Sequence, residues 1–98
     1  LWNWTDQGLR AIKNSPTRLA SFKTKPEKAG GKLIVEYYTM GQYDGIVIVE
    51  APTDDTIMSI MLSAASKGNF RSTSLRAFPV SEASEIIEKI SPSGSDKV

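Results

Sequence analysis

The feature that most constrains the fold is Ile46-Val47-Ile48-Val49, four β-branched residues in a row. Such residues favour strands, and successive side chains of a strand point to opposite faces of its sheet. Because both parities are apolar, both faces of the sheet must be covered. The helices of a small domain cover only one face, and a chain of 98 residues is too short to supply a further layer. We therefore predict a homodimer, in which a second copy covers the other face of the sheet.

This run is the second strand of a predicted β-hairpin. Residues 32–38 form the first strand, and residues 39–45 contain the glycine and aspartate that are typical of a turn. Residues 1–4 are predicted as the end of an earlier strand. Residues 70–78 are predicted as a fourth strand, which Pro79 ends.

Helices are predicted between these strands. Thr5 caps a first helix, which is interrupted near Pro16 and ends or kinks near Pro26. Thr53 caps a second helix that ends at Gly68, and Ser81 caps a last helix that extends to about residue 90. Residues 91–98 are polar, and we expect a disordered tail there.

The order of these elements is β-α-β-β-α-β with an additional terminal helix. It predicts an α+β, ferredoxin-like domain over residues 1–90, with an antiparallel four-stranded sheet and helices on one face. Two such domains that pair through the bare faces of their sheets form a dimeric α/β barrel.

The composition excludes several classes of site. The chain has no cysteine and no histidine, and its acidic residues do not have the spacing of a calcium loop, so we expect no metal site and no cofactor. A net charge of +1 provides no general attraction to nucleic acid or membranes. No run reaches the ~18 apolar residues of a membrane span. We therefore expect neither nucleic acid nor membrane as a partner, and a cytoplasmic location.

The turn and its surroundings resemble the GYD domain family, small bacterial proteins named for a Gly-Tyr-Asp motif. The motif here is Gly41-Gln42-Tyr43-Asp44, with a glutamine after the glycine. The similarity continues through residues 3–8, 15–16, 30–33, 49–52, 68–69 and 75–78. It implies the dimeric α/β barrel superfamily and no established activity. Glu36 departs from the aliphatic pattern expected of its strand, where a charge needs a partner or solvent.

Asp44 is the candidate catalytic residue. A carboxylate beside Tyr43, with Arg76 nearby at a strand end, can act as a desolvated base or anchor a ligand. The alternative is structural, because aspartate often accepts hydrogen bonds from the backbone of a turn. Asn3, Trp4, Tyr43 and Arg76 are candidate ligand-binding residues; the first two are suggested by analogy with cofactor-independent oxygenases of the superfamily.

Two functions remain open at this point. The first is a small homodimeric protein with a small-molecule-binding or regulatory role, with a pocket between sheet and helices near Tyr43-Asp44. The second is a cofactor-independent enzyme of the monooxygenase or isomerase type, with Asp44 as base. Whether the chain is an enzyme is left undecided by the sequence.

Overall fold

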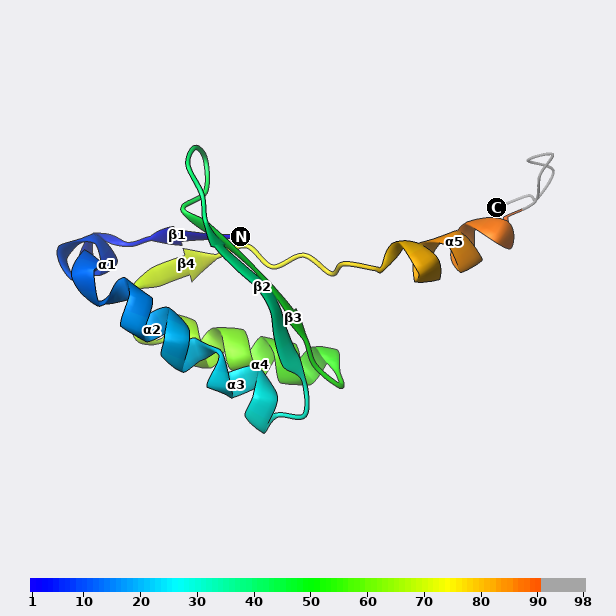
Figure 1. The fold of residues 1–98 in the computed structure, drawn as a ribbon, viewed down its shortest axis with the longest axis horizontal. Coiled ribbons are helices and arrows are strands. Elements are labelled where there is room, and N and C mark those ends of the chain that lie inside the picture. Colours follow the sequence, from blue (N-terminus) through cyan, green and yellow to red (C-terminus); the bar gives the residue numbers. More distant parts are fainter. Residues whose placement is uncertain (91–98) are drawn as a thin grey trace.

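The computed structural model describes residues 1–90 and has a ferredoxin-like α+β fold (Figure 1). The predicted tail of residues 91–98 lies outside the described residues. The sheet has the order β2-β3-β1-β4, and all neighbouring strands are antiparallel, which confirms the predicted fold class. In chain order the elements are β1 (Trp2–Trp4), α1 (Asp6–Arg10), a 3₁₀ turn (Ile12–Asn14), α2 (Ser15–Phe22), α3 (Thr24–Lys28), β2 (Lys32–Tyr38), β3 (Gly45–Glu50), α4 (Asp54–Ala65), β4 (Phe70–Ser72) and α5 (Val80–Glu88).

Two of the predicted caps explain where α1 and α4 begin, and a glycine explains where the α4 region ends. The Thr5 hydroxyl accepts a hydrogen bond from the backbone N–H of Gly8 at 3.1 Å, and Thr53 caps α4 in the same way. Gly68 ends the α4 region with a positive φ of 83°, which glycine adopts without steric cost. Pro26 lies in the first turn of α3, where its missing N–H breaks no helical hydrogen bond, and its side chain is fully buried.

The core lies between the sheet and helices α2 and α4. Phe22 from α2 and Ile60 and Ala64 from α4 are buried together, and Leu33, Val49 and Phe70 of the sheet pack against them. Trp2 of β1 is also buried. One face of β3 is therefore covered by the helices, because Val49 packs against this core. Among residues 1–90, no helix is long and apolar enough to cross a membrane.

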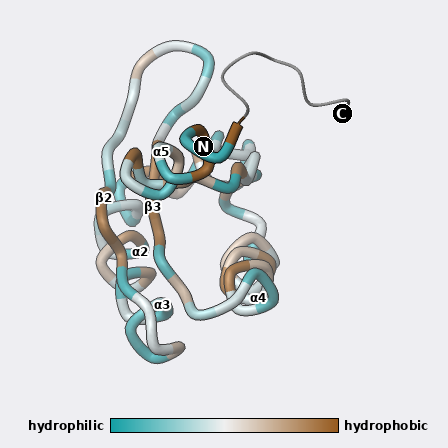
Figure 2. Tube along the Cα trace, turned by 90° about the vertical axis from the view of Figure 1, so that its right-hand side faces the viewer, coloured by the Kyte–Doolittle hydropathy of each residue, from teal (hydrophilic) through white to brown (hydrophobic). Residues whose placement is uncertain are grey.

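The other face of the hairpin has no helix over it. A β-bulge between Leu33 and Val35 resets the alternation of β2, so that Val35 pairs with Ile48 and Tyr37 with Ile46. Tyr37 is 63% exposed and Ile48 is 40% exposed. Figure 2 shows the apolar segments of β2 and β3 side by side. The outer face of the hairpin is defined here by these paired residues and the bulged one: Ile34, Val35, Tyr37, Ile46 and Ile48.

The C-terminal region differs from the prediction. The fourth strand pairs only through residues 70–72 and not to residue 78, and α5 begins at Val80 without the predicted cap from Ser81. Residues 73–90, called here the C-terminal arm, run away from the rest of the chain (Figure 1). The Cα radius of gyration is 17.1 Å, whereas a compact domain of this length has about 13 Å.

Candidate functional site

An apolar pocket lies on the inner face of the sheet, between α2 and α4. Its cavity volume is about 130 Å³. The sheet contributes aromatic and aliphatic walls, and the two helices contribute the sides. The lining residues are Trp2, Trp4, Ser15, Arg18, Leu19, Ser21, Phe22, Lys25, Val47, Met61, Ala64, Lys67, Asn69 and Phe70. This pocket lies between sheet and helices, but neither Tyr43 nor Asp44, near which a pocket was predicted, is among its lining residues.

Two tryptophans form the wall of the pocket on β1. The rings of Trp2 and Trp4 meet edge to face with centroids 5.2 Å apart, and Phe70 lies 6.2 Å from Trp2 in a similar orientation. The Trp2 indole packs directly over Gly45 of the neighbouring strand, where an added Cβ would lie only 2.1 Å from the ring. Gly45 thus allows the bulky indole to lie flat against the sheet.

Basic side chains surround this apolar lining. Arg18 and Lys25 come from α2 and α3, and Lys67 follows α4. Arg18 is held in place, because its Nη1 donates a hydrogen bond to the carbonyl of Ala11 at 3.0 Å. The pocket therefore combines an aromatic interior with positive charge among its lining groups, which suits a ligand that has an apolar body and an anionic group.

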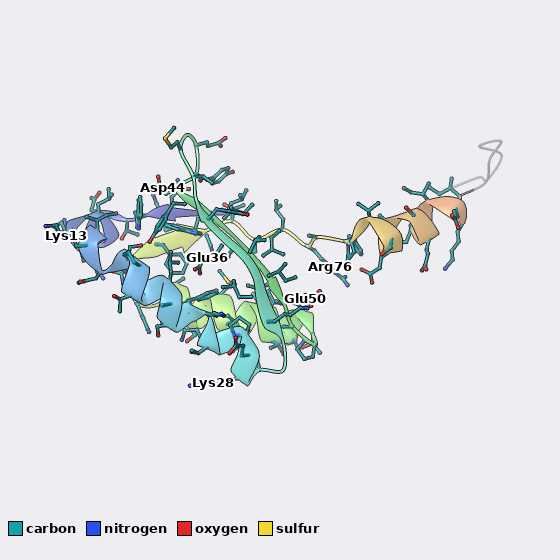
Figure 3. All side chains as sticks on the ribbon, viewed as in Figure 1. Lys13, Lys28, Glu36, Asp44, Glu50 and Arg76 are labelled. Carbon is teal, nitrogen blue, oxygen red and sulfur yellow. The ribbon has the colours of Figure 1, made fainter. Side chains whose placement is uncertain are left out.

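Glu36 of β2 lies close to this pocket, opposite Val47 in the sheet register. Its Oε2 atom is buried and has no hydrogen-bond partner among the described residues. Burial raises the pKa of the Glu36 carboxyl above its ordinary value, and the charge of Lys23 offsets part of this effect. The charge of Glu36, which Figure 3 labels, is thus only partly compensated.

Asp44 joins the hairpin turn to β1. Its Oδ2 accepts a hydrogen bond from the backbone N–H of Trp4 at 3.0 Å and a longer one from Asn3 Nδ2 at 3.5 Å. The backbone N–H of Asp44 donates to the carbonyl of Trp2 at 2.9 Å. Asn3 Nδ2 also donates to the carbonyl of Gln42 at 2.9 Å. These bonds fix the turn against the first strand. The structural interpretation expected a backbone donor within the turn, whereas the donor to Oδ2 is the N–H of Trp4 in β1.

The five predicted site residues are only partly brought together. Asn3, Trp4, Tyr43 and Asp44 lie around the turn, whereas Arg76 lies on the C-terminal arm (Figure 3). Arg76 forms an exposed ion pair with Asp54 at 3.8 Å and lies over the Phe78 ring. Of the five, only Trp4 lines the pocket. Their roles in binding or catalysis stay predictions.

Several pocket residues lie at positions that the sequence marks only as core positions. Phe22, Met61 and Ala64 have the helical spacing of an apolar stripe, which correctly places them toward the sheet. That spacing cannot show that the facing side chains leave space between them. The basic residues carried a stronger signal, since the first third of the chain is rich in lysine and arginine.

One end of the pocket is built by segments that are distant in sequence. Gly8 packs against the carbonyl of Asn69, where a Cβ would lie at 2.0 Å, and the N–H of Thr5 donates to the same carbonyl at 3.2 Å. Gln7 Nε2 donates to the carbonyl of Lys67 at 2.9 Å. Together these contacts hold the α4–β4 connection against α1.

The described residues contain no cluster of three or more acidic, histidine or cysteine side chains that is suited to a metal ion. The candidate site therefore consists of the apolar lining, its basic residues and the turn at Asp44.

Comparison with known proteins agrees with this architecture. The GYD domain family model matches residues 1–87. A relative from Thermus thermophilus, named glutamine synthetase and cystathionine beta-lyase binding protein, is 30% identical over 79 residues, which cover 80% of this chain and 83% of the relative. No solved structure matches the chain. The chain belongs to the GYD domain family.

Proposed function

We propose that this protein is a homodimeric binding protein with a regulatory role, and that its ligand occupies the pocket between α2, α4 and the sheet. The observation that carries the proposal is the pocket itself, an aromatic cavity of about 130 Å³ with basic residues in its lining. A cavity of about 150 Å³ accommodates a benzene molecule. The ligand class that fits is therefore a single-ring aromatic compound, or an aliphatic one of similar size, that carries a carboxylate.

The relative's printed name supports a binding role. It describes a protein that binds glutamine synthetase and cystathionine beta-lyase. By analogy, we propose that this chain also binds other proteins, and that occupancy of the pocket influences this binding. Occupancy has such an effect only if the ligand binds the free and the complexed protein with different affinities.

The position of Asp44 favours binding over catalysis. Its Oδ2 is engaged by the Trp4 N–H and the Asn3 amide, and Asp44 does not line the pocket. A general base must lie within hydrogen-bond reach of the proton that it removes. A ligand in this pocket has no such contact with Asp44, so the alternative function as a cofactor-independent enzyme gains no support from the geometry.

The homodimer is proposed from the outer face of the hairpin. Its apolar side chains include Tyr37, Ile34 and Ile48, which are 63%, 46% and 40% exposed. A contiguous apolar face of this kind on a sheet is typical of an interface. A second copy that presents the same face would cover it through a two-fold axis.

Benzoate is a suitable first probe for the pocket. The only two tryptophans of the chain, Trp2 and Trp4, both line it, so intrinsic fluorescence reports on occupancy. We expect benzoate to change this fluorescence saturably and to bind more tightly than benzyl alcohol, which lacks the charge. Lys25→Met should weaken benzoate binding but leave benzyl alcohol unaffected.

A second pair of variants tests the location. Ala64→Phe fills the pocket from α4 and should abolish the fluorescence response, whereas Ser63→Phe, on the exposed side of the same helix, should retain it. Circular dichroism establishes that both variants are folded. A response that is unchanged in folded Ala64→Phe, or no response to either probe in the wild-type protein, would contradict a ligand of this class in this pocket.

A further inference from the structure

The C-terminal arm exposes an unusual amount of apolar side chain. In α5 no residue is buried, although one side of the helix carries isoleucines. Six large apolar side chains of residues 73–90 are at least half exposed: Leu75 at 74%, Phe78 at 50%, Val80 at 82%, Ile86 at 52%, Ile87 at 62% and Ile90 at 62%. Isolated helices shorter than ~12–15 residues are marginal in water, and α5 has nine residues. The arm therefore has the composition of a segment that is stabilised by a partner.

The extended part of the arm that precedes α5 also lacks backbone pairing within residues 1–90. Thr73 still exchanges hydrogen bonds with Leu1, at 2.7 Å and 3.2 Å. Beyond it, within the part of the chain that the structure describes, residues 74–78 make no backbone hydrogen bond to another element. An extended segment with free N–H and C=O groups is able to add to the edge of a sheet.

A matching edge exists on β2. In the order β2-β3-β1-β4, strand β2 is at one end of the sheet and pairs only with β3. It is seven residues long, close to the length of the extended segment 74–79, whereas the other edge strand, β4, has three residues. The arm cannot pair with β2 of the same chain, because it continues directly from β4 at the opposite end of the sheet.

The charges of α5 and α3 are complementary, which favours a position of α5 beside β2. The helix carries Glu82, Glu85 and Glu88, and its last turn contains no basic residue. Helix α3 packs beside β2 and carries Lys25 and Lys28, with Lys23 directly before it. An arm that follows the edge of β2 brings its acidic helix toward these lysines, so opposite charges meet across the contact.

From these observations we infer that the C-terminal arm is exchanged between two copies of the chain. Residues 74–79 of one copy add to the free edge of β2 in the other, and α5 then packs with its isoleucines against that copy, with its glutamates near α3. The inference rests on the proposed homodimer and goes beyond it, since sheets can pair through their outer faces without any exchange of arms.

Engineered cysteines test the contact directly, because the chain has none of its own. Leu75→Cys chains are mixed with Tyr37→Cys chains, equilibrated and oxidised mildly. The control mixture replaces Tyr37→Cys with Met58→Cys, which lies on α4 and is 64% exposed, similar to Tyr37 at 63%. We expect a disulfide-linked heterodimer, identified by mass spectrometry of the joined peptides, in the first mixture and not in the second.

The outcomes separate the two proposals. A dimer in light scattering that gives equal or no cross-linking in the two mixtures overturns the exchange and leaves the homodimer standing. A monomer at all concentrations overturns both, and would assign the arm to a different protein.

A second test uses the dimer dissociation constant. Ile87→Asp should raise it by about tenfold or more, whereas Ser84→Asp, on the same helix, should leave it nearly unchanged. Equal effects would also overturn the exchange.

Discussion

At the scale of single residues, the carboxylates of Asp44 and Glu36 have opposite effects on the stability of the fold. Asp44 is a hydrogen-bond acceptor that holds the hairpin turn against β1. Glu36 is a partly buried charge whose Oε2 lacks a partner among residues 1–90. Asp44 stabilises the folded state through its hydrogen bonds. Glu36 destabilises the folded state because its charged carboxylate loses hydration when it is partly buried.

Asp44→Ala removes the acceptor for the N–H of Trp4. We expect the free energy of unfolding to fall by about 1–3 kcal/mol, because a partly buried backbone donor is left without its bond. Urea unfolding at a fixed protein concentration measures this change. Gln42→Ala is the control, since the nearby turn contact uses only the backbone carbonyl of Gln42. Equal losses in the two variants would contradict the anchoring role of Asp44.

Glu36→Gln should alter the pH dependence of stability. Burial raises the pKa of Glu36 in the folded protein above its ordinary value of 4.5. Between these two pKa values the folded state keeps a proton that the unfolded state has lost, so this residue makes stability fall as pH rises through that window. The gain in stability from Glu36→Gln should therefore grow from about pH 4 toward neutrality and then level off.

Urea midpoints measured across this pH range provide the test. Glu27→Gln, at an exposed position of α3, serves as the control and should follow the wild-type curve. A difference between Glu36→Gln and wild type that does not change with pH would show that Glu36 is well hydrated in the folded protein.

At the scale of elements, close approach of strands depends on glycines. Gly45 accommodates the Trp2 indole, and Gly31 packs against the carbonyl of Glu50, where a Cβ would lie at 1.9 Å. Gly41, in the turn, has open space around it but a φ of 111°. The first two glycines are required by packing, and the third by backbone conformation.

Gly45→Ala should destabilise the protein more than Gly41→Ala. The methyl group at position 45 must displace the Trp2 ring, and overpacking of this kind costs about 1–3 kcal/mol or more. At position 41 the cost is backbone strain alone, about 1 kcal/mol. Thermal unfolding of both variants measures the difference, and near-ultraviolet circular dichroism should show a disturbed tryptophan environment only for Gly45→Ala. The opposite order would contradict the close packing of β1 on β3.

The elements that could be predicted from the sequence are those with local causes. Thr5 and Thr53 cap helices, Gly68 ends one, and the continuous run of β-branched residues 46–49 marks the second hairpin strand. The bulge at Ile34 was not predicted, because no proline or glycine marks it. The fourth strand was predicted, but its length was overestimated, since residues 73–78 have strand-like composition and their pairing depends on a partner and not on propensity.

At the scale of the whole molecule, apolar surface remains uncovered in two places, the outer face of the hairpin and the C-terminal arm. The two apolar parities of residues 46–49 predicted that the first surface is apolar. Its cover by a second copy stays a prediction. The pocket could be predicted only in its general position between sheet and helices. Its volume depends on how the side chains of α2 and α4 meet, which no spacing in the sequence reveals.

The proposed dimer predicts that the melting temperature depends on protein concentration. Unfolding that is coupled to dissociation becomes less favourable at higher concentration, so a tenfold increase should raise the melting temperature by about 3 °C. Differential scanning fluorimetry across a dilution series measures this shift. Ile48→Asp, on the outer face, should lower the melting temperature and remove the concentration dependence; Met58→Asp, on the opposite side, should preserve it. A melting temperature that is independent of concentration in the wild-type protein would contradict the dimer.

The C-terminal arm also has a consequence for the lifetime of the protein. Its extended segment contains Arg76, which is 70% exposed in its side chain and lies where no other backbone protects the chain. Proteases cut extended, accessible segments of this kind, and they cut a population in proportion to the fraction that is open. A chain that finds a second copy would hide this segment, whereas a solitary chain would be degraded. The rate of degradation per chain would then fall as the concentration of the protein rises.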